Sequence, residues 1–210
     1  MLETKLPLCP AGLLSAVKNE YQSFSKVLES EKDKEKDIKI QLVPYSYVNV
    51  SVEKVLLDDE QISAGSIPLA EDEEAMITLT KIKEEEGEEE FTTTVKYKGE
   101  PVELKIIPGR YQIDILALAN RETIIPAEER TTGNWPFQTS YEMPEIELPN
   151  PHPWGGVKID EWKIFKEDIN RGKITFKILS FPEPRKIEDI DYLSKLYELS
   201  DEYKVYLVPK

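Results

Sequence analysis

Carboxylates and one histidine are the side chains in this sequence that could carry out acid–base chemistry. Glu128, Glu129 and Glu142 could supply the two carboxyl groups of a hydrolase that cleaves glycosidic bonds. The chain has 41 acidic residues, however, so some pair lies at a suitable separation in almost any fold. A cleft and a raised pKa on one carboxyl group are needed before proximity supports catalysis. A carboxylate-dependent hydrolase is therefore an alternative function and not the leading one.

His152 lies in the sequence Asn150-Pro151-His152-Pro153-Trp154 and is the only histidine. It has no second histidine for a metal site or a triad-like array, although Glu142 or Glu145 could fold near it. Gly155-Gly156 lacks the spacing and the Lys-Ser/Thr partner of a phosphate-binding loop, and no serine nucleophile elbow occurs. We therefore predict no catalytic residues and no cofactor.

The glutamate-rich run at residues 84–90 could in principle offer oxygen ligands to Ca²⁺. Calcium-binding loops mix Asp, Asn and Gly at set positions, whereas this run is nearly uniform glutamate. The sequence therefore favours a solvated turn here, and we predict no metal site.

A proline- and aromatic-rich segment, residues 121–157, is the candidate binding region. Its six prolines and weak alternation predict a long irregular loop, of the kind that is either functional or disordered. Its large aromatic side chains need a surface, which argues against disorder. In one interpretation they cover an open sheet face; in the other, some stay exposed as a platform for sugar rings or for a partner's side chains. The candidate binding residues are Trp135, Phe137, Tyr141 and Trp154.

A β-rich core must position this segment. Residues 38–120 contain about six runs in which apolar and polar residues alternate, which predicts an antiparallel meander that forms a sandwich or a barrel. The clearest part is residues 101–119, where two alternating runs flank Ile107-Pro108-Gly109-Arg110. Proline presets φ at the second position of a tight turn and glycine supplies a positive φ at the third. We therefore predict a hairpin with a type II turn.

The heptad Ile107-Pro108-Gly109-Arg110-Tyr111-Gln112-Ile113 resembles the PGxYxI/V turn of transthyretin-like and carboxypeptidase-regulatory-like β-sandwich domains. The resemblance covers this one turn. It implies an extracytoplasmic, non-catalytic β-sandwich in which Tyr111 opens a strand and its hydroxyl bonds back across the corner, as in the tyrosine corner of immunoglobulin-like sandwiches. The motif is structural and implies no functional residues.

Helices are predicted near both ends of the chain. Apolar residues three or four apart between residues 10 and 30 predict an amphipathic helix, and a linker of mixed charge follows it. A strand at residues 173–181 precedes a second amphipathic helix at residues 187–203. The predicted organisation is a helix and linker at 1–37, a sandwich core at 38–120, a long loop at 121–157, and a strand–helix segment at 158–210 that completes the same domain.

The amino-acid composition limits the classes of partner that this chain is expected to bind. The formal net charge of −14 argues against nucleic acid and against an anionic membrane surface. No run of 18 apolar residues is present to span a membrane, and no signal peptide is recognisable. A single cysteine, Cys9, rules out an internal disulfide framework. Abundant Glu and Lys are typical of proteins from hot habitats, which suggests a thermophilic source.

The leading expectation is therefore a mainly β chain, an antiparallel sandwich with an N-terminal and a C-terminal helix. It would act as a non-catalytic extracytoplasmic interaction module of a cell-surface or envelope protein. A glycan-binding module is one alternative. A subunit that self-associates through its N-terminal helix or an unpaired sheet edge is another. The expected partner is a protein or a glycan, and a cytoplasmic location stays open.

Overall fold

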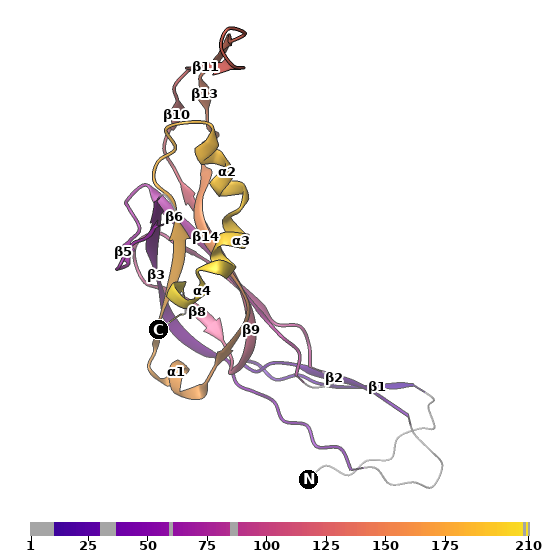
Figure 1. Cartoon of the computed structure of the whole chain (residues 1–210). Helices are drawn as coiled ribbons and strands as arrows, with labels where there is room; N and C mark the ends of the chain where they lie inside the picture. Colours follow the sequence, from indigo (N-terminus) through magenta and orange to yellow (C-terminus); the bar gives the residue numbers. More distant parts are fainter. Residues whose placement is uncertain (1–10, 30–36, 59–60, 85–87, 208, 210) are drawn as a thin grey trace.

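Alternating apolar residues build one large sheet in the computed structural model, which describes residues 11–29, 37–58, 61–84, 88–207 and 209. The strand order is β4-β3-β15-β14-β9-β6-β7, and β5 and β8 also pair with β3 (Figure 1). The strands are β3 (Ser46–Asp58), β4 (Gln61–Ile62), β5 (Ile67–Pro68), β6 (Glu73–Lys81), β7 (Thr92–Tyr97), β8 (Val102–Ile106), β9 (Gly109–Ala119), β14 (His152–Ile164) and β15 (Lys173–Ser180).

The sheet curls around a single core. On β9, Tyr111, Ile113 and Ile115 are fully buried, and Val50 and Val52 of β3 lie in the same apolar cluster. Strand β8 contacts β7, which is the last strand of the order, so the two ends of the sheet approach each other. The chain is thus mainly β, as predicted from its alternation.

The predicted hairpin at residues 101–119 is wrong. Strand β8 pairs with β3, whereas β9 pairs with β6 and β14, so the chain crosses the core at Ile107-Pro108-Gly109. Gly109 does have a positive φ, of 152°, and a Cβ there would lie 2.6 Å from the Cε of Lys81. The glycine therefore admits Lys81 at a corner between strands and does not close a two-stranded turn.

One strand pair departs from the predicted antiparallel arrangement. Strands β3 and β15 run parallel, with Val50 opposite Ile174 and Val52 opposite Phe176. The two strands are more than a hundred residues apart, so no tight turn dictates their direction. Their apolar faces fit the core in either orientation, and alternation alone does not distinguish the two.

The predicted N-terminal helix is also wrong. Residues 12–28 form a two-stranded ribbon of β1 (Gly12–Ala16) and β2 (Phe24–Leu28), which projects from the body (Figure 1). A turn at residues 18–21 separates the strands; the Tyr21 N–H donates to the Lys18 carbonyl and Glu20 has a φ of 62°. The apolar residues that have helical spacing in the sequence lie on both sides of this turn. Cys9 and most of the charged linker, residues 31–36, lie outside the described residues.

Residues 124–147 form a second ribbon, which we call the arm. Strand β10 (Ile124–Ile125) pairs with β13 (Ile146–Glu147), and β11 (Glu128–Thr132) pairs with β12 (Thr139–Met143). The arm projects from the body at the end opposite to the β1–β2 ribbon (Figure 1). The predicted irregular loop is thus wrong over this range. Pro126 and Pro144 lie between the paired segments and Pro136 lies in the turn, so the prolines mark breaks in a ribbon.

Short helices complete the fold. Helix α1 (Lys166–Asn170) joins β14 to β15, and α2 (Glu188–Ser194), α3 (Leu196–Glu202) and α4 (Lys204–Leu207) follow β15. The predicted C-terminal helix is therefore present as consecutive short helices, which pack on β14 and β15. Gly156, expected in a connection, lies inside β14, where a Cβ would be 2.4 Å from the Ile115 carbonyl oxygen. Within the described residues, no helix is long and apolar enough to cross a membrane.

Candidate functional site

The tip of the arm exposes two large aromatic side chains. Trp135 is 85% exposed and Phe137 is 84% exposed. The turn that carries them closes on itself, because the Phe137 N–H donates to the Asn134 carbonyl oxygen at 2.7 Å. Gly133 has a φ of +94°, and a Cβ there would lie 2.4 Å from the Phe137 carbonyl oxygen. The backbone is therefore compact, and both rings point into solvent.

The four aromatic candidates are not brought together. Trp135 and Phe137 share the tip, and Tyr141 lies on β12 with 43% of its surface exposed. Trp154 is buried in the body at the base of the arm, with the Arg121 guanidinium 4.3 Å above its ring. Trp154 is therefore buried, whereas the other three aromatic side chains remain accessible.

The shank of the arm, between tip and base, is acidic and tied to helix α2. Arg130 is its one cation and pairs with Glu128 at 3.2 Å and with Glu188 of α2. Both carboxylates raise the pKa of Arg130, and the hydrogen bond to Glu188 has the larger effect. A cleft of about 560 Å³ lies beside this contact and includes Tyr141 and Lys186 in its lining. The other acidic residues of the shank are Glu129, Glu142, Glu145 and Glu147.

The carboxylates considered for hydrolysis lie on this shank. Glu128 and Glu129 are consecutive residues of β11, so their side chains leave opposite faces of the ribbon. Glu142 is directly opposite Glu129 but does not line the cleft. Glu128 is engaged by Arg130, and Glu129 accepts a hydrogen bond from Ser140 at 2.8 Å. Glu128 and Glu129 thus both line the cleft, and each is already engaged by another side chain.

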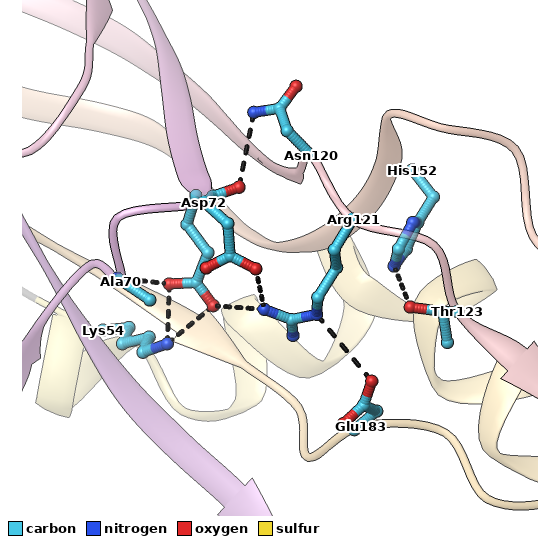
Figure 2. Close-up of polar contacts among 9 residues, drawn as sticks. Lys54, Ala70, Asp72, Asn120, Arg121, Thr123, His152 and Glu183 are labelled. Atoms are coloured by element: carbon cyan, nitrogen blue, oxygen red, sulfur yellow. Dashed lines mark hydrogen bonds and ion pairs between the residues drawn. The ribbon is translucent and has the colours of Figure 1, made fainter.

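A cluster of charged and polar residues lies where the arm leaves the body; we call it the base cluster (Figure 2). Lys54 donates to both carboxylate oxygens of Glu73, at 2.7 and 2.6 Å, and both side chains are nearly buried. Arg121 lies 2.7 Å from Asp72 and 3.8 Å from both Glu73 and Glu183. The hydrogen bond from Arg121 is the main cause that lowers the pKa of Asp72.

The base cluster joins strand ends that are distant in sequence. Lys54 comes from β3, Asp72 from just before β6, Glu73 from its first position, Arg121 from just after β9, and Glu183 from just after β15. His152 opens β14 and is 1% exposed, with its Nε2 3.5 Å from the hydroxyl of Thr123. The cluster ties together the segments that flank the arm.

Sequence reasoning missed Lys54, Glu73 and Arg121. For Lys54 and Glu73, the sequence does contain a signal. Lys54 continues the buried alternation of Val48, Val50 and Val52, and Glu73 begins the one that continues with Ala75 and Ile77. Charged residues in phase with a buried strand face imply a buried ion pair. Arg121 follows β9 in an irregular segment and carries no comparable signal.

Among the described residues, no group of three or more His, Cys, Asp or Glu side chains is placed to hold a metal ion. Comparisons with protein-family models, with curated proteins and with solved structures found no match to this chain.

Proposed function

We propose that this chain is a non-catalytic interaction module that binds a protein partner through the tip of the arm. The observation that carries the proposal is the pair Trp135 and Phe137, 85% and 84% exposed at the end of a projecting ribbon. Exposed aromatic side chains of this kind are typical anchors of protein interfaces, where they fill pockets of the partner. The compact turn beneath them reduces the conformational entropy that binding would cost.

The rest of the molecule acts as the scaffold of this arm. We infer that the curled sheet is an antiparallel-type sandwich interrupted by the parallel β3–β15 pair. The Arg130–Glu188 contact fixes the shank against α2, and the base cluster fixes its root. A rigid arm presents the tip in one orientation, which supports binding to a preformed pocket.

The charge of the arm indicates what surrounds that pocket. The shank carries five glutamates against the single cation Arg130. A partner with an apolar pocket and a rim of Lys and Arg would be attracted to it, whereas nucleic acid and anionic membranes would be repelled. The net charge of −14 also opposes close approach of a second copy.

We place the module outside the cytoplasm, on the surface or envelope of a thermophile. The heptad at residues 107–113 supports the location, and the Glu/Lys-rich composition supports the source.

Photo-crosslinking from the tip tests the proposal. Phe137 is replaced by a photoreactive benzoylphenylalanine, and adducts are formed in an extract of the source organism. Unlabelled wild-type protein should suppress the adduct, and the Trp135→Ala/Phe137→Ala variant should not. The matched competitor is Val205→Ala/Tyr206→Ala, which removes two exposed apolar side chains of α4 and should suppress the adduct like the wild type. Equal competition by both variants would exclude the tip as the site.

A glycan array on the same protein addresses the alternative partner class. Tyr141 and the polar neighbours Asn134 and Gln138 are the groups of the arm that suit a sugar. A glycan that protects Trp135 from acrylamide quenching would replace the protein partner by a carbohydrate. Sedimentation over a wide concentration range separates both from self-association, which alone would raise the mass of the isolated chain.

A further inference from the structure

His152 occupies the fork where two paired strands leave the sheet and become the arm. Its pairing with Ala119 is the outermost one between β14 and β9. Beyond it, the Leu148 N–H donates to the Thr123 carbonyl oxygen at 3.0 Å, and the β10–β13 pairing begins. The imidazole therefore points from the segment that returns from the arm towards Thr123, in the segment that enters it (Figure 2).

The fork is built for a neutral ring. His152 is 1% exposed and Thr123 is 2% exposed. The Nε2 atom lies 3.5 Å from the Thr123 hydroxyl, and Nδ1 has no hydrogen-bond partner among the described residues. Trp154 packs edge-on against the ring, with 5.7 Å between the ring centroids. The Pro149 carbonyl is a backbone acceptor that favours a second ring N–H, but burial of the ring has the larger effect.

The charged groups around the ring do not compensate an imidazolium. Arg121 lies over Trp154 and is already paired with Asp72, with Glu73 3.8 Å away. Glu183 is the anionic side chain that acts on the ring, and it is 59% exposed, so its field is screened by water. Burial is the main cause that lowers the pKa of His152, and the Arg121 charge adds to it; the Pro149 backbone and Glu183 act in the opposite direction.

We propose that His152 is a proton-sensitive latch: the neutral imidazole holds the fork closed, and its protonation opens the fork and frees the arm from its fixed angle to the body. A protonated ring must recruit water to solvate its charge, and water reaches this position only when the Thr123 and Leu148 segments separate. The latch concerns the geometry of the arm and does not depend on which partner the arm binds.

The direction of the pH effect follows from the site. Because the folded protein holds the pKa of His152 below the usual value of about 6.5, the open and unfolded states bind a proton more readily. The closed fork is fully stable above that value and loses stability as the pH falls below it, towards the folded pKa. Asp72 and Glu74 have lowered pKa values and act in a separate, more acidic range.

Nuclear magnetic resonance tests the latch directly, because a chain with one histidine has one imidazole signal to titrate. We expect a pKa below about 6.5. Amide exchange then locates the opening. Between about pH 7.5 and about pH 5.5, which is one unit below the usual histidine pKa of about 6.5, the protection factor of the Leu148 amide should fall by up to about tenfold. The Asn49 amide, bonded to the Gly172 carbonyl at the far end of the sheet, should keep its protection.

His152→Gln completes the test, because glutamine retains hydrogen-bonding groups and does not titrate. The variant should lose the pH dependence of Leu148 protection. A histidine pKa at or above the usual value overturns the proposal even if the variant fails to fold. An equal loss of protection at Leu148 and Asn49 also overturns it, since that marks unfolding of the whole sheet. Retention of the pH dependence in His152→Gln has the same consequence.

Discussion

Tyr111 and Ile107 are joined by two hydrogen bonds that close the corner between β8 and β9. The Tyr111 hydroxyl donates to the Ile107 carbonyl oxygen at 2.8 Å and accepts the Ile107 N–H at 3.3 Å. Both residues are fully buried, and burial raises the pKa of Tyr111 far above its usual value. A single side chain thereby satisfies both backbone groups of a residue at which the chain crosses the core.

Replacement of this hydroxyl should destabilise the fold. Tyr111→Phe leaves the N–H and the carbonyl of Ile107 buried and unpaired, which costs about 1–3 kcal/mol of unfolding free energy. Urea denaturation measures the loss. The matched control is Tyr47→Phe, whose hydroxyl bonds Glu20 on the surface at 2.8 Å and should change stability by less than about 0.5 kcal/mol. Equal effects of the two variants would argue against a structural role for the corner.

The tyrosine corner is also the part of the fold that sequence predicted best. The heptad at residues 107–113 implied that the Tyr111 hydroxyl bonds back across the corner, and it does so. The alternation within β3 and β9 indicates which of their residues face the core. It could not identify which strand pairs with which, because period two specifies a face and not a neighbour. The alternation therefore predicts a β8–β9 hairpin, although β8 pairs with β3.

The candidate site was predicted less completely. Trp135 and Trp154 have the same chemistry and lie in the same proline-rich segment, yet one is 85% exposed and the other 5%. The difference arises from tertiary structure, since one residue lies at the turn of a ribbon and the other inside a long strand. The base cluster depends on strand ends that meet only in the folded sheet. The sequence alone indicates only that Lys54 and Glu73 lie at buried positions of their strands' alternation.

The buried pair of Lys54 and Glu73 should be sensitive to loss of one partner. Glu73→Gln leaves the Lys54 ammonium buried without its carboxylate and should cost about 3–5 kcal/mol. The double variant Lys54→Met/Glu73→Leu should cost less than the sum of the costs of Lys54→Met and Glu73→Leu measured singly, because neither charge remains in the double variant. Lys96→Met is the control; it breaks a 2.6 Å pair with Glu74 in which Lys96 is 45% exposed, and should cost at most about 1 kcal/mol. Additive single and double variants would show that the pair is not coupled.

Gly156 should not accept a side chain. A Cβ would lie 2.4 Å from the Ile115 carbonyl oxygen and 3.1 Å from the Leu196 Cδ2 atom, so Gly156→Ala must displace β9 or α3. Overpacking of this kind costs about 1–3 kcal/mol, which thermal unfolding would detect. Gly65→Ala is the matched control, because a Cβ at Gly65 has nothing within 4 Å. If the two variants have the same melting temperature, the packing of β14 against β9 and α3 accommodates a methyl group without strain.

Acid should weaken the root of the arm through Asp72. The Arg121 guanidinium holds the pKa of Asp72 below its usual value, so the folded state keeps this carboxylate ionised more readily than the unfolded chain does. Its contribution to stability is therefore present above about pH 4 and is lost as the pH falls through the folded pKa. Asp72→Asn should remove this step from a plot of stability against pH and should leave the step of His152 at higher pH unchanged. Asp160→Asn, which removes an exposed carboxylate of β14, should retain both steps. If Asp72→Asn follows the wild-type curve below pH 4, the carboxylate has the same affinity for protons in both states, and Arg121 does not anchor the arm through it.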